Sequence, residues 1–254
     1  MTNEHKAELE ALCLRFRNDL VDILHSIQTG HPGGSLSCCE IVTALYQDIM
    51  NVDPKNPEME GRDHFILSKG HAAPMLYLNL AEKGFFPKEE LKTLRQLGSR
   101  LQGHPCVHKL PGVELSTGPL GLGLGAGLGM AIADKMKGYK NYTYVLLGDG
   151  EIQEGAIWEA AMAGAKYKPD NLIAILDYNG VQLDGTTEQI MPMGDIPAMT
   201  KRTALQPPAF CPAPSIGILP PTPRRVCSAM YSSRFTVFTS SFLRLFSPVS
   251  GSDT

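Results

Sequence analysis

Two short polar groups, each following an apolar run, are the part of this sequence best suited to chemistry. Gly148-Asp149-Gly150 follows the run 142–147, and Asp177-Tyr178-Asn179-Gly180 follows the run 172–176. A carboxylate and an amide oxygen are hard ligands of the kind that Mg²⁺ takes, with water and substrate phosphates completing its octahedron. The glycines let a backbone approach a diphosphate closely, and a helix that begins at Gly155 presents an N-terminus that favours an anion.

The two apolar runs, 142–147 and 172–176, are expected to be buried strands that position these groups. Residues 154–166 between them have helical apolar spacing, so the segment predicts a right-handed βαβ unit with parallel strands. Ligands of open α/β sheets bind at the carboxyl ends of such strands. Asp149 or Asn179 alone would indicate only a turn, but both together at matched strand ends indicate a shared metal site.

Helices are expected on both faces of this parallel sheet. Apolar residues at intervals of three and four predict a helix over 9–27, and residues 37–40 (Ser-Cys-Cys-Glu) have the pattern of a capping box for a helix that reaches about Met50. A short strand over 65–67 and a helix ending near Lys83 follow. The predicted fold class is therefore α/β, a parallel sheet flanked by helices on both faces.

The overall composition fits a folded protein without a membrane span. The chain has 254 residues, of which 43% are apolar and 19% charged, so a large core can form and bulk disorder is excluded. The net charge of -3 argues against a nucleic-acid binder driven by charge, and no apolar run of about 18 residues occurs. Six scattered cysteines and a charged start without a signal core predict reduced thiols and a cytoplasmic location.

The composition changes sharply after Met199. Residues 1–199 hold 17 basic residues, 25 acidic residues and all seven histidines, whereas residues 200–254 hold six basic residues and one acid. Prolines exclude a helix or a central strand across 207–223. We therefore expect an α/β domain over 1–199 and an irregular, Pro/Ser-rich tail over 200–254. The tail is expected to be disordered or to come from a shifted reading frame, and a genuine binding tail is the other alternative.

Five short motifs occur in the order in which transketolases carry them. They are Gly30-His-Pro-Gly-Gly-Ser35, Ser68-Lys-Gly-His71, Gly103-His-Pro105, Ser116-Thr-Gly-Pro-Leu-Gly121, and Gly148-Asp-Gly followed by Asn179. Each motif alone is weak, but the ordered set is specific. Residues 5–199 thus resemble the amino-terminal part of transketolases. They are most similar to the amino-terminal subunit of split transketolases, and less similar to deoxyxylulose-phosphate synthase, whose histidine motifs are built differently.

The resemblance implies a thiamine diphosphate-binding fold and a metal-binding role for several residues. Asp149, the side chain of Asn179 and the backbone carbonyl of Val181 would bind Mg²⁺, and Gly150 would lie against the diphosphate. The activity implied is transfer of a two-carbon ketol unit between ketose and aldose phosphates, in the pentose phosphate pathway of carbohydrate metabolism.

Further roles implied by the resemblance concern the cofactor rings and the substrate channel. Gly118 and Leu120 would pack near the aminopyrimidine and the thiazolium, and Glu154 would face a partner subunit. Three histidines would line the channel above the reactive thiazolium carbon: His31, His71 and His104, of which His71 would also contact the cofactor. Neutral histidines near pH 7 both donate and accept protons, which suits sugar hydroxyls.

The resemblance also implies a partner chain. In the family, a glutamate that contacts the aminopyrimidine lies in a second domain, which does not fit after residue 199. A carboxy-terminal subunit is therefore expected to supply it, the chain alone is expected to be inactive, and self-association is expected. The family pattern should continue past residues 195–197 into further helix–strand units and another histidine. Because residues 200–254 contain no histidine, the α/β domain is expected to be truncated.

Three other functions remain open. The composition break suggests a non-catalytic, truncated fragment, and the cofactor motif alone also fits a deoxyxylulose-phosphate synthase-like or other thiamine diphosphate enzyme. The glycine run 118–129 contains GxGxxG-like spacings that would suit a nicotinamide-dependent oxidoreductase. No clear strand precedes that run, and its spacing predicts a helix with a close-packed glycine face. Each glycine within a helix costs about 1 kcal/mol of stability relative to alanine, so close backbone packing must offset that cost.

Overall fold

A parallel sheet forms the centre of the protein. The computed structural model describes residues 2–196 and the backbone of residues 235–239. In this part of the chain the strand order is β1-β2-β3-β6, and all neighbours pair in parallel. The strands are β1 (His64–Leu67), β2 (Thr143–Gly148), β3 (Leu172–Tyr178) and β6 (Phe235–Thr239). The three strands predicted from the apolar runs are thereby confirmed, within one or two residues at their ends.

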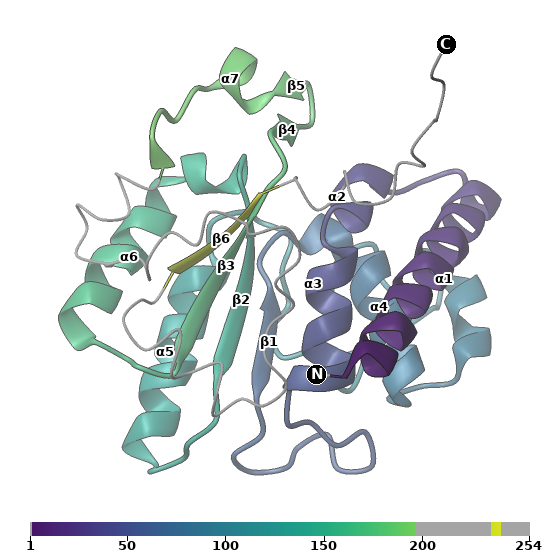
Figure 1. Ribbon diagram of the computed structural model, residues 1–254, viewed down its shortest axis with the longest axis horizontal. Helices are drawn as coiled ribbons and strands as arrows, with labels where there is room; N and C mark the ends of the chain where they lie inside the picture. Colours follow the sequence, from purple (N-terminus) through teal and green to yellow (C-terminus); the bar gives the residue numbers. More distant parts are fainter. Residues whose placement is uncertain (1, 197–234, 240–254) are drawn as a thin grey trace.

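Helices cover both faces of the sheet, as predicted (Figure 1). α1, α3 and α4 lie on one side, and α5 and α6 lie on the other. The helices are α1 (Asn3–Ile27), α2 (Pro32–Leu36), α3 (Cys39–Ala44), α4 (Ala73–Lys83), α5 (Gly123–Met136), α6 (Gly155–Tyr167) and α7 (Thr187–Ile190), with a π-helical turn at Leu45–Ile49 and short 3₁₀ turns at Gly70–Ala72, Lys88–Thr93 and Glu151–Gln153. Among the residues described, no helix combines the length and the apolar character needed to cross a bilayer.

Alternate side chains of the strands enter two separate cores. Tyr144 and Leu146 pack in the core shared with α1, α3 and α4, whereas Val145 and Leu147 pack in the core shared with α5 and α6. Because successive side chains of a strand point to opposite faces, a strand that is covered on both faces must be apolar throughout. This explains why β2 appears in the sequence as a run that is apolar from Tyr144 to Leu147.

The capping box predicted at residues 37–40 is wrong. Ser37 instead closes α2, its N–H donating to the carbonyl of Gly33 at 3.0 Å, and Cys38 precedes α3 without a side-chain cap. The Ser37 hydroxyl donates to Oδ2 of Asp177 at 2.5 Å. A hydrogen bond to a buried carboxylate is stronger than one to a neutral helix end, so this long-range contact outweighs the local cap.

The tail contributes one described element. Residues 235–239 form β6, which pairs with β3 from Ala174 opposite Phe235 to Tyr178 opposite Thr239. No turn or cap signal in the sequence predicted a strand there. The other predictions for residues 200–254, including disorder and a shifted reading frame, lie outside the described residues.

From Gly123 onward the glycine run lies in α5 and brings the backbone of this helix close to the sheet, as predicted, whereas Gly118 and Gly121 precede the helix with positive φ. A Cβ at Gly127 would come within 2.5 Å of Cγ2 of Val145 and 3.2 Å of Cδ1 of Ile66, whereas a Cβ at Gly129 would meet nothing within 4 Å. We expect Gly127→Ala to destabilise the protein by about 1–3 kcal/mol through overpacking, and Gly129→Ala to stabilise it by up to about 1 kcal/mol. Chemical denaturation measures both, and equal midpoints for the two variants would contradict this packing.

Candidate functional site

The structure brings Asp149 and Asn179 to adjoining turns. β2 and β3 end side by side in register, so the residues that follow them lie at the same edge of the sheet (Figure 1). The buried carboxylate of Asp149 accepts N–H bonds from Gly150 at Oδ1, at 2.8 Å, and from Gly180 at Oδ2, at 2.5 Å. Because Gly180 directly follows Asn179, the second bond ties the carboxylate to the turn that carries the amide.

The amide of Asn179 is held at both of its polar atoms. Its Oδ1 accepts from the N–H of Val181 at 2.9 Å, and its Nδ2 lies 3.4 Å from Oγ of Ser37 and 3.4 Å from Oδ2 of Asp177. A carboxylate only accepts hydrogen bonds, so the nitrogen must face Asp177. Oδ1 keeps a second lone pair, which is the one available to another ligand.

A buried ion pair that the motifs did not predict lies against this turn. Nζ of Lys69 is 2.5 Å from Oδ2 of Asp177, and the two residues are 1% and 5% exposed. Burial opposes the charge of Lys69, but nearby anionic groups, Asp177 among them, raise its pKa overall. Lys69 belongs to the Ser68-Lys-Gly-His71 motif, but its partner lies 108 residues away, and no local spacing could have identified that partner.

Glu151 is a second buried acid that the motifs did not predict. Its Oε1 accepts from the Ser68 hydroxyl at 2.5 Å and from the N–H of Gly121 at 2.9 Å, and its Oε2 accepts from the N–H of Gly148 at 3.0 Å. Burial raises the pKa of this carboxyl, against the effect of these three bonds. One side chain thus ties the end of β2 to two of the sequence motifs. Its position one residue after Gly150 was the only signal in the sequence.

The three predicted histidines gather in one place. The rings of His31 and His71 are edge-to-face, with centroids 5.5 Å apart. The ring of His104 lies 3.4 Å from the position of a Cβ on Gly118, and the backbone N of Gly118 lies 2.8 Å from the position of a Cβ on Gly70, the residue before His71. A Cβ on Gly34 would come within 2.7 Å of the His71 ring, so a larger residue there would have to displace that ring. Four motifs that are far apart in the sequence therefore converge.

Burial keeps His71 neutral. It lowers the pKa of His71 to about 4, and the positive charge of Lys69 acts in the same direction. Burial also lowers the pKa of His104, and the charge of Arg95 adds to this effect. At pH 7 His71 therefore carries one ring proton and one free lone pair, so it can both donate and accept.

This pKa predicts a loss of stability in acid. The unfolded chain binds a proton at His71 near pH 6.5, whereas the folded chain binds it only near pH 4. The free energy of unfolding should therefore fall as the pH drops from 6.5 towards 4. In urea denaturation, we expect His71→Gln to lose less unfolding free energy than the wild type between pH 7 and pH 5. The control is His108→Gln at an exposed position, which should lose as much unfolding free energy as the wild type. Equal losses for His71→Gln and the wild type would contradict this assignment.

The remaining predicted residues surround the same edge of the sheet. Gly118 has a φ of 152°, which favours glycine, and a Cβ on Gly150 would lie 3.1 Å from Cβ of Gln182. The side chains of Leu120 and Val181 are 39% and 59% exposed, and Val181 begins a two-residue strand, β4 (Val181–Gln182), that pairs antiparallel with β5 (Gly185–Thr186). Glu154 is also exposed, at the start of α6.

The donor set fits a hard cation that carries a diphosphate. Asp149 offers a carboxylate, Asn179 an amide oxygen and Val181 a backbone carbonyl, all of them the oxygen ligands that Mg²⁺ prefers. Burial raises the pKa of Asp149, although the N–H groups of Gly180 and Gly150 oppose the shift. A cation beside this carboxylate offsets the cost of burying its charge.

Comparisons with known proteins point to one family. Residues 10–199 match the family model described as transketolase, thiamine diphosphate binding domain. An apulose-4-phosphate transketolase subunit of Phocaeicola vulgatus is 50% identical over 183 residues, which cover 72% of this chain and 65% of that protein. The 6-deoxy-6-sulfo-D-fructose transketolase subunit SqwG of a Clostridium species is 43% identical over 191 residues, which cover 75% of this chain and 70% of that protein.

Longer relatives and solved structures give the same result. The transketolase of Aquifex aeolicus is 42% identical over 198 residues, which cover 74% of this chain but 28% of that protein. A transketolase from Pichia stipitis in complex with sedoheptulose 7-phosphate superposes with a TM-score of 0.74 at 30% identity, covering 91% of this chain and 35% of that one. Transketolase from Leishmania mexicana gives a TM-score of 0.75 at 25% identity, covering 91% and 36%. The chain thus spans about two thirds of the separate subunits and about a third of the longer enzymes.

Proposed function

Because the chain belongs to the transketolase family and carries its thiamine diphosphate-binding domain, we propose that it is the amino-terminal subunit of a split transketolase that uses thiamine diphosphate and Mg²⁺. The observation that carries this proposal is the placement of Asp149 and Asn179 on adjoining turns at the ends of β2 and β3. The similarity to relatives named as transketolase subunits supports a second chain that completes the enzyme.

We propose that this chain holds the metal and the diphosphate end of the cofactor. Asp149, Oδ1 of Asn179 and the carbonyl of Val181 would bind Mg²⁺, with Gly150 against the diphosphate. When bound, thiamine diphosphate supplies a carbon nucleophile that also acts as an electron sink. Lys69 and Asp177 keep the Asn179 amide turned so that its oxygen is available to the cation.

The histidines would donate protons to the sugar and accept protons from it. Gly118 and Leu120 would lie beside the cofactor rings, and Gly118 lies near His104. Because burial keeps His71 neutral at pH 7, it can exchange protons with a substrate hydroxyl, together with His31 and His104. General acid–base catalysis of this kind contributes ~10²–10⁴ in rate. The substrates proposed are ketose and aldose phosphates of the pentose phosphate pathway, and the compartment proposed is the cytoplasm.

Glu154 is proposed to face the partner subunit. It is exposed at the start of α6, and its Cβ lies 2.8 Å from the position of a Cβ on Gly121. We expect Glu154→Gln to change the stability of the chain by less than about 0.5 kcal/mol and to lower ketol transfer by the assembled enzyme. Glu159→Gln, exposed on the same helix, is the matched control. If the two variants retained the same activity, Glu154 would have no role at the interface.

The proposed function is tested by reconstitution. The chain is co-expressed with a carboxy-terminal transketolase subunit, and two-carbon transfer from a ketose phosphate to an aldose phosphate is assayed with thiamine diphosphate and Mg²⁺. We expect transfer by the pair, none by the chain alone, and loss of transfer with a chelator. Failure of the pair, beside an active natural pair, would contradict the proposal.

Thermal melting separates a binding defect from a catalytic one. A ligand that binds only the folded state raises the melting temperature. A shift with thiamine diphosphate and Mg²⁺ but no ketol transfer would favour a non-catalytic fragment that keeps the cofactor site. An unchanged melting temperature with thiamine diphosphate and Mg²⁺ would contradict the proposed cofactor site itself.

A further inference from the structure

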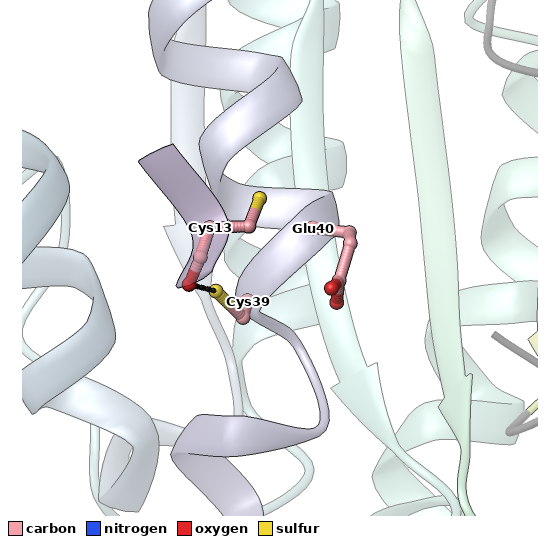
Figure 2. Close-up of side chains that lie close together, drawn as sticks. All are labelled: Cys13, Cys39 and Glu40. Carbon is pink, nitrogen blue, oxygen red and sulfur yellow. Dashed lines mark hydrogen bonds between the residues drawn. The ribbon is translucent and has the colours of Figure 1, made fainter. Parts of the chain in front are cut away.

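Two thiols and a carboxylate meet between α1 and α3 (Figure 2). Cys13 lies on α1, and Cys39 and Glu40 lie in the first turn of α3; one ligand atom from each residue lies within 4.8 Å of the others. Cys13 is 5% exposed and Cys39 fully buried, and the Cys39 thiol donates to the carbonyl oxygen of Cys13 at 3.5 Å. Both are free thiols, so the two helices carry a reduced, preformed pair at their contact.

A guanidinium gives this pair an electropositive neighbour. Arg17 forms an ion pair with Glu40, and its charge favours the ionised form of both thiols. The two sulfurs lie within 4.8 Å of each other, so a sulfenic acid formed on one of them can be reached by the other. The guanidinium favours a thiolate at this contact without selecting one of the two sulfurs.

We propose that Cys13 and Cys39 form a reversible redox site that closes to a disulfide between α1 and α3 in the presence of a peroxide. One of the two sulfurs attacks one oxygen of hydrogen peroxide, becomes a sulfenic acid, and water leaves. The other sulfur then attacks the sulfenic sulfur, the S–S bond forms, and the hydroxyl leaves as a second water. The two thiols together lose two electrons and two protons, which reduce one peroxide to two waters. The site does not depend on the proposed cofactor.

The surroundings favour a disulfide over a bound metal. Two sulfurs and a carboxylate are also ligands for a divalent metal, but Arg17 already pairs with the carboxylate of Glu40 and places a positive charge beside the sulfurs. A divalent cation there would be repelled. Cys38 does not compete for either partner, since its thiol donates to the carbonyls of Gly34 and Ser35 at 3.4 Å each.

Peptide mapping of the full chain tests the proposal. The reduced protein is treated with hydrogen peroxide, alkylated and digested with trypsin without reduction. Trypsin places Cys13 in the peptide 7–15 and Cys39 in the peptide 18–55. We expect a species that joins these peptides and is lighter than their sum by two hydrogen atoms, and we expect dithiothreitol to remove it. No such species in the wild type would overturn the proposal.

Single variants identify which cysteine is linked to Cys13, because the peptide 18–55 also contains Cys38. Cys38→Ala should keep the link, and Cys39→Ala should lose it while retaining a native circular dichroism spectrum. A link that survives Cys39→Ala would overturn the pairing. Zn²⁺ added to the reduced protein is the metal probe. Two results together would overturn the redox site in favour of a metal site. The wild type but not Cys13→Ala would retain Zn²⁺ after dialysis, and peroxide would produce no link.

Discussion

Asp149→Ala is expected to lower ketol transfer by the assembled enzyme on the order of 10³-fold, because a bound metal contributes several kcal/mol and each 1.4 kcal/mol is about tenfold. Asp149 is the only carboxylate among the three proposed ligands, and its two oxygens also receive the N–H groups of Gly150 and Gly180. Its removal therefore takes away the charge that attracts the cation and loosens the turn that carries Asn179.

The measurement that isolates this effect is metal-dependent cofactor binding. The Mg²⁺ concentration that gives half-maximal binding of thiamine diphosphate should rise by at least about 100-fold in Asp149→Asn, which keeps the shape of the side chain. Changes outside the ligand set typically lower metal affinity by about 10–100-fold, so the loss of a charged ligand should cost at least the upper value. Asp184→Asn, exposed in the nearby β4–β5 turn, is the control. A similar Mg²⁺ requirement in both variants would place the metal elsewhere.

Lys69→Met is expected to destabilise the folded chain by about 3–5 kcal/mol, since it leaves the carboxylate of Asp177 buried without its cation. Nζ of Lys69 lies 2.5 Å from Oδ2 of Asp177, and the two residues are 1% and 5% exposed. Against a total stability of about 5–15 kcal/mol, such a loss can unfold much of the population. Urea denaturation with circular dichroism measures it.

A double-mutant cycle shows whether the ion pair is the cause. Lys69→Met combined with Asp177→Asn removes both charges and should be more stable than Lys69→Met alone. The exposed pair of Lys135 and Asp170, at 2.7 Å with side chains 53% and 58% exposed, provides the contrast, and Lys135→Met should cost less than about 1 kcal/mol. Additive losses at Lys69 and Asp177 would mean that the two charges do not stabilise each other.

The central architecture was predictable because its signals are local. A strand buried on both faces must be apolar throughout, so 142–147 and 172–176 were found as strands, and polar residues directly after them had to meet at one edge. The helical nature of the glycine run followed from its spacing, and α5 confirms it for residues 123–129.

The contacts that hold the site were not predictable, because they join distant parts of the chain. Ser37 had the local pattern of a helix cap but donates to Asp177, 140 residues away. In the sequence, Glu151 is distinguished only by its place in a glycine-rich turn, and its contacts with Ser68 and Gly121 are visible only in the fold. The meeting of His31, His71 and His104 was expected only from resemblance to a family, since no spacing rule relates them.

The three bonds accepted by Glu151 have a consequence for how a ligand arrives. They fix the Ser68 loop, the Gly121 loop and the end of β2 to one another in the free protein. The entropy cost of ordering these segments is therefore met when the chain folds and not when a ligand binds, which is the advantage of a preorganised receptor. Binding of a ligand beside these segments should then require little rearrangement of them.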